Sequence, residues 1–133
     1  MLKRNRRSLF MLLALTFPFV FAGCSSNSSP VTYEQISGAK AKALMDSEQG
    51  YIIIDARTQE EYDGGHIPGA ILIPEYEIAE RAEKELANKK QLILVYCRSG
   101  RRSKIAAKEL VKLGYTNVKE FGGIIDWQYE IVK

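Results

Sequence analysis

The residues best suited to carry out a reaction in this chain are six in a row, Cys97-Arg98-Ser99-Gly100-Arg101-Arg102. A cysteine reacts as its thiolate, which neighbouring cations and backbone N–H groups favour by lowering the pKa of the thiol. Three arginines lie within five residues of Cys97, and Gly100 permits the tight turn that a loop around an anion needs. The pattern predicts a reactive cysteine in an anion-binding loop rather than a buried structural cysteine.

This stretch lies between two segments whose patterns predict different secondary structure. Residues 91–96 are a nearly continuous apolar run, typical of a strand that is buried on both faces. Residues 103–113 carry apolar side chains at helical spacing, and Gly114 follows in a C-cap position. Cys97 therefore falls where a strand ends and a helix begins, which is where open α/β sheets bind ligands and where the helix dipole favours an anion.

The alternation of strand and helix patterns continues through the rest of the domain. A short apolar run ends at Asp55, and residues 58–61 fit a capping box that opens a brief helix. This alternation predicts an α/β fold with a parallel sheet of about five strands, flanked by helices on both faces. The length leaves room for one domain, residues 31–133. The expected strands are 51–54, 71–73, 91–96 and 118–121, and the expected longer helices are 36–45, 76–88, 103–113 and 124–130.

Five ordered segments resemble the motifs of one protein family. The cysteine loop that closes on a helix resembles the active-site loop of the rhodaneses, a family of sulfurtransferases. The other matching segments are Ile54-Asp55-Ala56-Arg57, Glu60-Glu61-Tyr62, Gly65-His66-Ile67-Pro68-Gly69-Ala70, and Gly122-Gly123 followed by Trp127. Because these segments span nearly all of residues 31–133, the domain resembles a single-domain rhodanese, which implies a rhodanese-like parallel sheet.

The resemblance implies sulfur transfer through a covalent intermediate. Cys97 would attack the outer sulfur of a donor such as thiosulfate, and the resulting persulfide would pass that sulfur to an acceptor such as cyanide or a thiol. No metal or organic cofactor is implied. The anionic donor would be held by the rest of the loop, namely Arg98, Ser99, Gly100, Arg101 and Arg102.

Residues outside the loop are expected to have structural roles. Asp55 should position the loop by hydrogen bonding, and Arg57 should pair with an acid such as Glu61. His66 is the single histidine of the chain, and the family signature places it in a structural turn. Trp127 is expected in the core.

Two other functions stay open for this loop. Phosphatases and arsenate reductases that share the fold use a cysteine followed six residues later by an arginine, but Ser103 occupies that position here and Arg102 lies one residue too early. Tyr96 also stands where the phosphatase pattern has histidine. Rhodanese-like binding modules without activity usually lack the cysteine, whereas Cys97 is present.

Residues 1–23 have the layout of a secretory signal peptide. Four of the 19 basic residues lie in positions 1–8, and the apolar run 9–20 that follows is too short for a membrane-spanning helix. The segment Phe21-Ala22-Gly23-Cys24 resembles the lipobox of bacterial lipoproteins, in which the cysteine is lipidated before cleavage. Residues 24–30 would then form a serine-rich linker between the lipid and the domain.

This layout predicts an exported protein, anchored by lipid to the bacterial cell envelope on the outer face of the cell membrane, or on the periplasmic side of a two-membrane envelope. Cleavage near Ala22 with an incidental Cys24, a Cys24–Cys97 disulfide, and export through a twin-arginine signal at Arg6-Arg7 stay open as alternatives. Beyond residue 24 there are 15 basic and 16 acidic residues, a balance that argues against nucleic acid as a partner. The expected partners are the membrane and a small-molecule sulfur donor and acceptor.

The lipid-anchor prediction is tested by Cys24→Ala. Without the thiol that carries the lipid, the protein should leave the membrane fraction or stay uncleaved, and labelling by a fatty-acid probe should disappear. Labelling that is unchanged in this variant, measured in parallel with the wild-type chain, would contradict the prediction.

Overall fold

The computed structural model describes residue 30 and residues 32–133. The predicted signal peptide, Cys24 and nearly all of the linker 24–30 lie outside the described residues. Within the described residues, every helix is too short or too polar to cross a membrane. The elements in chain order are β1 (Glu34–Gln35), α1 (Gly38–Ser47), β2 (Ile52–Asp55), α2 (Gln59–Asp63), β3 (Ile71–Leu72), the 3₁₀ turn η1 (Glu75–Glu77), α3 (Ile78–Glu85), β4 (Ile93–Cys97), α4 (Arg101–Lys112), β5 (Val118–Gly123) and the 3₁₀ turn η2 (Ile124–Asp126).

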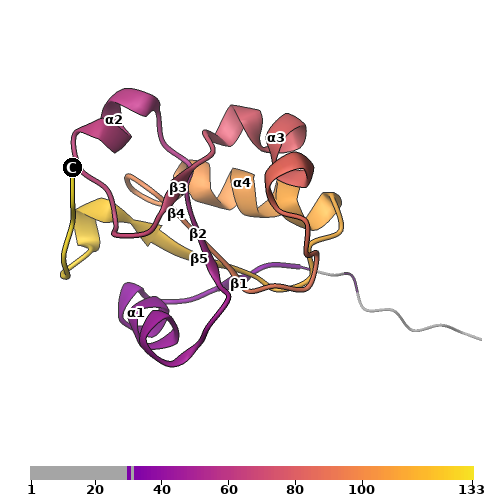
Figure 1. Ribbon diagram of the computed structural model, residues 1–133, viewed down its shortest axis with the longest axis horizontal. Helices are drawn as coiled ribbons and strands as arrows, with labels where there is room; N and C mark the ends of the chain where they lie inside the picture. Colours follow the sequence, from indigo (N-terminus) through magenta and orange to yellow (C-terminus); the bar gives the residue numbers. More distant parts are fainter. Residues whose placement is uncertain (1–29, 31) are drawn as a thin grey trace, which may run out of the picture.

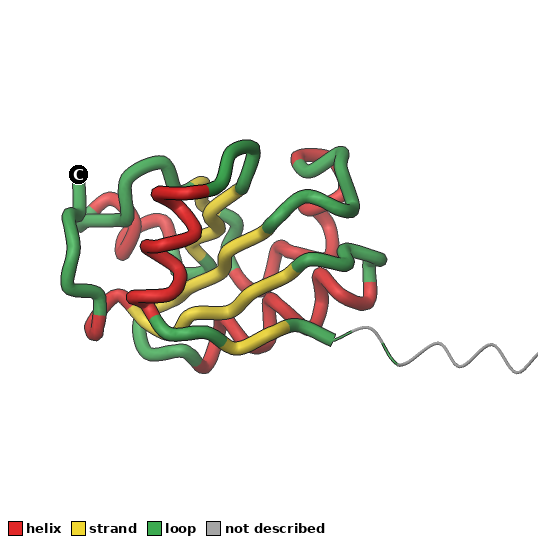
Figure 2. The backbone as a smooth tube through the Cα atoms, turned by 90° about the horizontal axis from the view of Figure 1, so that it is seen from below, coloured by secondary structure: helices red, strands yellow, loops and turns green. Residues whose placement is uncertain are grey.

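The five strands form one parallel sheet in the order β1-β5-β4-β2-β3. The central strand β4 lies between β2 and β5, and the register sets Ile54 of β2 opposite Val95 of β4. Helix α1 covers one face of the sheet, and α3 and α4 cover the other, as Figures 1 and 2 show. The predicted α/β class, the five-stranded parallel sheet and the helices on both faces are confirmed.

Alternating side chains of the strands supply two separate cores, because successive residues of a strand point to opposite faces. Ile54 and Val95 pack under α3 and α4, whereas Ile53 and Leu94 pack under α1. All four side chains are buried. The predicted apolar strands β2 and β4 are therefore buried on both faces, which is the usual state of a central parallel strand.

Helix α3 is shorter than the predicted helix 76–88, although its apolar stripe is as expected. Ile78, Ala82 and Leu86 are buried. The hydroxyl oxygen of Tyr115 lies 3.0 and 2.7 Å from the carbonyl oxygens of Ala82 and Leu86, and its one proton is donated to this pair. The hydroxyl thus supplies a donor to carbonyl groups at the end of the helix, where partners within the helix run out.

The predicted helix 124–130 is wrong. Only the turn η2 forms, and the chain then continues without helix, bending at Tyr129, until Val132 exchanges two backbone hydrogen bonds with His66. The Trp127 ring packs beside Phe121, and its Nε1 donates to the carbonyl of Glu130. These tertiary contacts override the weak helical pattern. Trp127 is half-buried against the α1-side core rather than fully enclosed.

Helix α2 begins with the predicted capping box. Thr58 accepts from the backbone of Glu61, and the Glu61 carboxylate accepts from the backbone N–H of Thr58 at 3.0 Å. The same carboxylate receives two hydrogen bonds from Arg102 of α4, at 2.7 and 2.8 Å. Glu61 therefore joins the first turns of two helices.

Arg57 pairs with an acid, as predicted, but the partner is Asp55 rather than Glu61, because Asp55 provides a nearer and more deeply buried carboxylate. The Arg57 guanidinium donates to both carboxylate oxygens of Asp55 and to the carbonyl of Gly65. The hydroxyl of Tyr96 donates to Asp55 at 2.6 Å and accepts from the backbone N–H of Ile67 at 3.1 Å. This buried network ties β2, β4 and the turn before Ile67 together.

The ion pair between Glu61 and Arg102 predicts a pH-dependent stability. The hydrogen bonds from Arg102 lower the pKa of Glu61 from 4.5 to about 2. Because the pKa is depressed in the folded state, the stabilisation is present above pH 4.5 and is lost as the pH falls through about 2. Glu61→Gln keeps the capping box but removes the charge, so we expect it to cost about 1 kcal/mol at neutral pH.

This difference should vanish near pH 2, as measured by denaturant unfolding over a pH series. The matched control is Glu60→Gln, which removes an exposed charge from the same turn and should change the free energy of unfolding by less than about 0.5 kcal/mol. A Glu61→Gln cost that is the same at neutral and acidic pH would contradict an ionic origin.

Candidate active site

The Cys97 sulfur lies at the point where β4 ends and α4 begins. Its residue is only 1% exposed, and three residues separate it from the first residue of the helix. Gly100, the N-cap of α4, has no side chain to cap the helix, and its φ of +102° is a left-handed conformation that glycine adopts readily. Its backbone N–H instead donates to the Cys97 sulfur at 3.0 Å. The sulfur therefore occupies the anion-binding position at the helix N-terminus.

Hydrogen bonding sets the acidity of this thiol. Burial raises the pKa of Cys97, but hydrogen bonds from the Ser103 hydroxyl and from the backbone of Ser103, Gly100 and Ser99 outweigh it and lower the pKa below the usual value. The predicted direction of the shift is thus confirmed. The predicted contribution of backbone N–H groups is confirmed. The loop arginines, which were also expected to lower the pKa, are not among its leading causes, whereas the Ser103 hydroxyl is.

The three arginines of the loop have different surroundings. Arg98 and Arg101 are exposed, and within the described part of the chain neither forms an ion pair. Arg102 is half-buried and forms an ion pair with Glu61. The hydrogen bonds that Arg102 donates to the Glu61 carboxylate raise the pKa of the guanidinium. A weaker attraction to Cys97 also raises it. Arg98 and Arg101 are therefore the cations that stay available to an incoming anion.

The loop packs closely against the end of β5. A Cβ atom at Gly123 would overlap the carbonyl of Arg98, so a side chain cannot fit at that position. The backbone N–H of Ile125 in η2 donates to the same carbonyl at 3.3 Å. The Gly-Gly pair that the sequence analysis singled out thus has a physical role, which is to let β5 approach the cysteine loop.

Two buried polar residues next to the loop were missed from the sequence. Ser103 is fully buried, and its hydroxyl lies 2.6 Å from the carboxylate of Glu120, which is 3% exposed. Ser103 was considered only as the residue that replaces a phosphatase arginine. The signal for Glu120 was its position two residues after Val118, because residues two apart in a strand share a face and Val118 is a core residue.

Asp55 supports the site less directly than predicted. Its carboxylate contacts Arg57 and the Tyr96 hydroxyl, and no hydrogen bond joins it to the described backbone of the loop. Tyr96 precedes Cys97 in β4, and its carbonyl accepts from the N–H of Ala56. Asp55 and Arg57 therefore hold the strand from which the loop departs.

His66 has the structural position that the signature implied. Its ring stacks on Tyr62 with centroids 3.7 Å apart, and its Nδ1 lies 3.0 Å from the Tyr62 carbonyl. These contacts hold the turn that leads to Ile67. Among the described residues, no three His, Cys, Asp or Glu side chains lie together as ligands for a metal ion.

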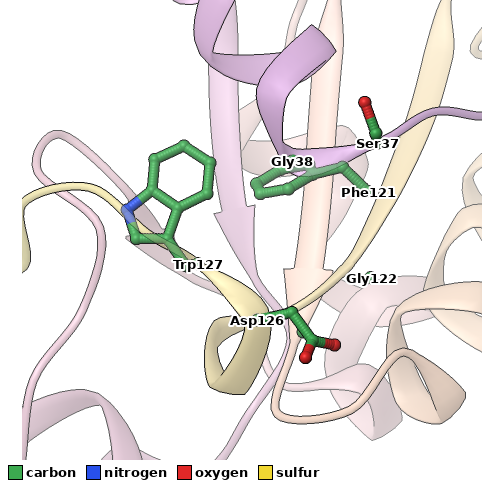
Figure 3. A pocket seen from close by; sticks show the side chains of 7 residues that line it. Ser37, Gly38, Phe121, Gly122, Asp126 and Trp127 are labelled. Carbon is green, nitrogen blue, oxygen red and sulfur yellow. The ribbon is translucent and has the colours of Figure 1, made fainter.

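Two clefts flank the end of β5. The cleft in Figure 3, of about 230 Å³, lies between the start of α1 and η2; Asp126 is its only charged residue, so it suits an anion poorly. The other, of about 360 Å³, is bordered by Arg57 and Arg98 and by three isoleucines. Because Arg98 follows Cys97 directly, this second cleft opens beside the cysteine loop. Its lining residues are Arg57, Glu61, Gly64, Gly65, Arg98, Ile124, Ile125 and Ile131.

Several named proteins are similar to this chain in sequence. The chain is 38% identical over 104 residues to the putative sulfur carrier protein YrkF of Bacillus subtilis, a match that covers 77% of this chain and 54% of that protein. It is 41% identical over 73 residues to the thiosulfate sulfurtransferase PspE of Escherichia coli, which covers 55% of this chain and 70% of the relative. The thiosulfate sulfurtransferase GlpE of Coxiella burnetii is 34% identical over 97 residues, 72% of this chain and 88% of the relative.

Solved structures share the fold. An E. coli structure described as rhodanese with anions superposes with a TM-score of 0.60 at 38% identity, over 63% of this chain and 99% of that one. A thiosulfate sulfurtransferase from Pseudomonas aeruginosa superposes with a TM-score of 0.68 at 27% identity, over 75% of this chain and 20% of that one. The sequence model of the family described as rhodanese-like domain matches residues 37–130, which include strands β2 to β5 and the Cys97 loop. The chain therefore belongs to the rhodanese-like domain family.

Proposed function

We propose that this domain is a sulfurtransferase that carries sulfane sulfur on Cys97. The observation that carries the proposal is the buried Cys97 sulfur at the N-terminus of α4, which accepts a hydrogen bond from Gly100 at 3.0 Å and whose pKa is lowered. A thiolate in such a position is a nucleophile held by backbone donors. The relatives named as thiosulfate sulfurtransferases make thiosulfate the first donor to test.

The proposed reaction has two displacements. In the first, the Cys97 thiolate attacks the outer sulfur of thiosulfate, a new S–S bond forms, and the old S–S bond breaks as sulfite leaves with the bonding electron pair. In the second, cyanide or a thiolate attacks the outer sulfur of the persulfide, and the Cys97 thiolate leaves with its electron pair. The backbone N–H groups that face Cys97 hold the sulfur anion in both steps.

The loop offers less support for phosphoryl or arsenate chemistry. Those reactions need a guanidinium that clamps the equatorial oxygens of the oxyanion. Arg102 is instead held by Glu61, and the next position holds the buried Ser103 hydroxyl. A non-catalytic binding module is disfavoured because the cysteine is present with a lowered pKa.

We propose the same cellular setting that the N-terminal sequence suggests. Export and lipidation at Cys24 would place the domain at the envelope surface, with residues 24–30 as the tether. The donor and acceptor would then be small molecules or thiols that reach this compartment.

Persulfide formation is the direct test of the proposed function. After exposure to thiosulfate, the tryptic peptide 91–98, which contains Cys97, should gain about 32 mass units, the mass of one sulfur. Cyanide should remove this mass and yield thiocyanate. Cys97→Ser should abolish both steps while the fold persists, because the hydroxyl is similar in size but is not a thiolate.

The outcome separates the three functions. Phosphate release from an aryl phosphate that depends on Cys97, with no persulfide formed, would favour the phosphatase alternative. An inert Cys97 in a folded protein would favour the binding module.

A second prediction concerns the recruitment of the donor by Arg98. Arg98→Ala removes an exposed cation beside the loop, so the second-order rate constant for thiosulfate should fall roughly tenfold at low salt, and less at high salt. Reaction with the neutral reagent iodoacetamide should change little. The matched control is Lys108→Ala, which removes an exposed charge from α4 two turns after its start and should leave the thiosulfate rate unchanged. An equal slowing with both reagents would show that Arg98 acts on the loop structure instead.

A further inference from the structure

Two isoleucines form an exposed apolar wall beside the cysteine loop. Ile125 is 62% exposed and Ile131 is 53% exposed, and both border the cleft of about 360 Å³ that Arg98 also lines. Three other large apolar side chains of the described residues are exposed, and none of them lines this cleft; they are Tyr76, Ile105 and Tyr129. Two exposed isoleucines in one hollow at a reactive site indicate a surface that a ligand covers.

Backbone contacts hold both isoleucines in place. The N–H of Ile125 donates to the Arg98 carbonyl at 3.3 Å, which ties η2 to the loop. The residue after Ile131 exchanges two backbone hydrogen bonds with His66. A Cβ atom at Gly65 would lie 3.4 Å from the Ile131 Cδ1 atom, so the isoleucine side chain rests on the backbone of that turn. The cleft is therefore formed before a ligand binds, which lowers the entropy cost of binding.

The charged residues that line the cleft leave one cation unpaired. Arg57 forms its ion pair with Asp55. Glu61 forms its ion pair with Arg102. Arg98 is exposed and has no ion pair within the described part of the chain. The cleft thus presents one positive charge next to an apolar wall, which complements a ligand with one negative charge and a hydrocarbon part.

The two reagents of the proposed reaction differ in how they suit this cleft. Thiosulfate is a small dianion without a hydrocarbon part, so it gains nothing from the isoleucines. An acceptor thiol reacts as its thiolate, which carries a single charge on the sulfur, while the rest of the molecule is free to be apolar. A thiol with further charged groups would have to strip water from them against the isoleucines, which is costly. The wall therefore favours an apolar acceptor.

We infer that the cleft is an acceptor subsite for apolar thiols, in which the thiolate is attracted by Arg98 and the hydrocarbon part packs on Ile125 and Ile131. This inference deepens the proposed function and rests on it. The acceptor thiolate attacks the outer sulfur of the Cys97 persulfide, a new S–S bond forms, and the old one breaks as the Cys97 thiolate leaves with the electron pair. The product is the persulfide of the apolar thiol. The two isoleucines then determine specificity, because they touch the acceptor and not thiosulfate.

A homologous series of alkanethiols tests the apolar wall. Ethanethiol to pentanethiol have closely similar thiol pKa values, so the series varies the apolar contact alone. The full chain is loaded with thiosulfate and freed of excess donor, and mass spectrometry follows the loss of the added sulfur from peptide 91–98. We expect the rate constant to rise about twofold per methylene, since the open cleft covers part of each group, and hence roughly eightfold over the series. A rate that is independent of chain length would overturn the inference.

Variants of the two isoleucines locate the contact. Ile125→Ala and Ile131→Ala should each slow transfer to pentanethiol about threefold, and the double variant roughly tenfold, because apolar contacts are lost. Transfer to cyanide, which has no hydrocarbon part, should fall far less. The matched control is Ile105→Ala, which truncates a 42% exposed side chain of α4 outside the cleft and should leave both rates unchanged. Equal slowing with pentanethiol and cyanide in the Ile125 and Ile131 variants would overturn the inference, because the loop itself would then have changed.

Arg98→Ala separates the charge from the apolar wall. Without the cation, every thiol of the series should react more slowly by one common factor, because each carries the same single charge on its sulfur. The rise per methylene should persist, since both isoleucines remain. Unchanged rates throughout the series would overturn the inference, because the cation would then take no part in binding the thiolate.

A second copy of the chain is an alternative occupant of the wall. A wild-type dimer that becomes a monomer in Ile125→Ala, measured by sedimentation equilibrium, would assign the wall to self-association and overturn the inference.

A failure of the proposed function gives a different result. A wild-type chain that forms no persulfide would contradict sulfur transfer itself, and N-alkylmaleimides of rising chain length then decide about the cleft. Faster labelling of Cys97 by the longer reagents, lost in Ile125→Ala, would support an apolar subsite beside the loop. Labelling that is independent of chain length would overturn it.

Discussion

A sulfur anion can be buried only if hydrogen-bond donors replace the water that it loses, and this constraint governs the architecture around Cys97. The residue is 1% exposed, and the N–H groups at the start of α4 are donors that the helix itself leaves unpaired. For them to reach the sulfur, β4 must run directly into α4 with a left-handed residue between them, which Gly100 provides. Gly123 has no side chain, so β5 can close the other side of the loop.

The strand that delivers Cys97 is held by a second buried network. Asp55 accepts hydrogen bonds from Arg57 and from the Tyr96 hydroxyl. Arg57 also donates to the Gly65 carbonyl, and the Tyr96 hydroxyl accepts from the Ile67 N–H, so both side chains hold the turn before Ile67. Removing one member would leave a buried charge or hydroxyl without its partner, which costs more than the pair itself contributes. The network therefore adds rigidity to β2 and β4 at their carboxyl ends, where the site lies.

The sequence predicts what depends on local pattern and misses what depends on which side chains meet. The strand before Cys97, the helix after it and the capping box at Thr58 follow from periodicity and from neighbours in the chain. The partner of Arg57 could not be chosen, since Asp55 and Glu61 are equally plausible by spacing and only burial distinguishes them. The path of the chain after η2 depends on contacts with His66, 66 positions earlier than Val132. The two-residue β1 is polar and exposed, so no apolar pattern marks it.

The charge distribution around the loop bears on which anion the site suits. Of three loop arginines, Arg102 is already neutralised by Glu61, and the position that a phosphatase gives to its arginine holds Ser103, backed by the Glu120 carboxylate. A carboxylate behind the loop repels a second charge in proportion to its magnitude. A phosphoryl dianion would have to place its oxygens within the loop against that repulsion and without a guanidinium clamp, whereas in the proposed reaction the loop holds only a thiolate or a persulfide, each with a single charge. The same carboxylate that disfavours an oxyanion is compatible with sulfur, because the Gly122 N–H and the Ser103 hydroxyl proton satisfy it before the substrate arrives.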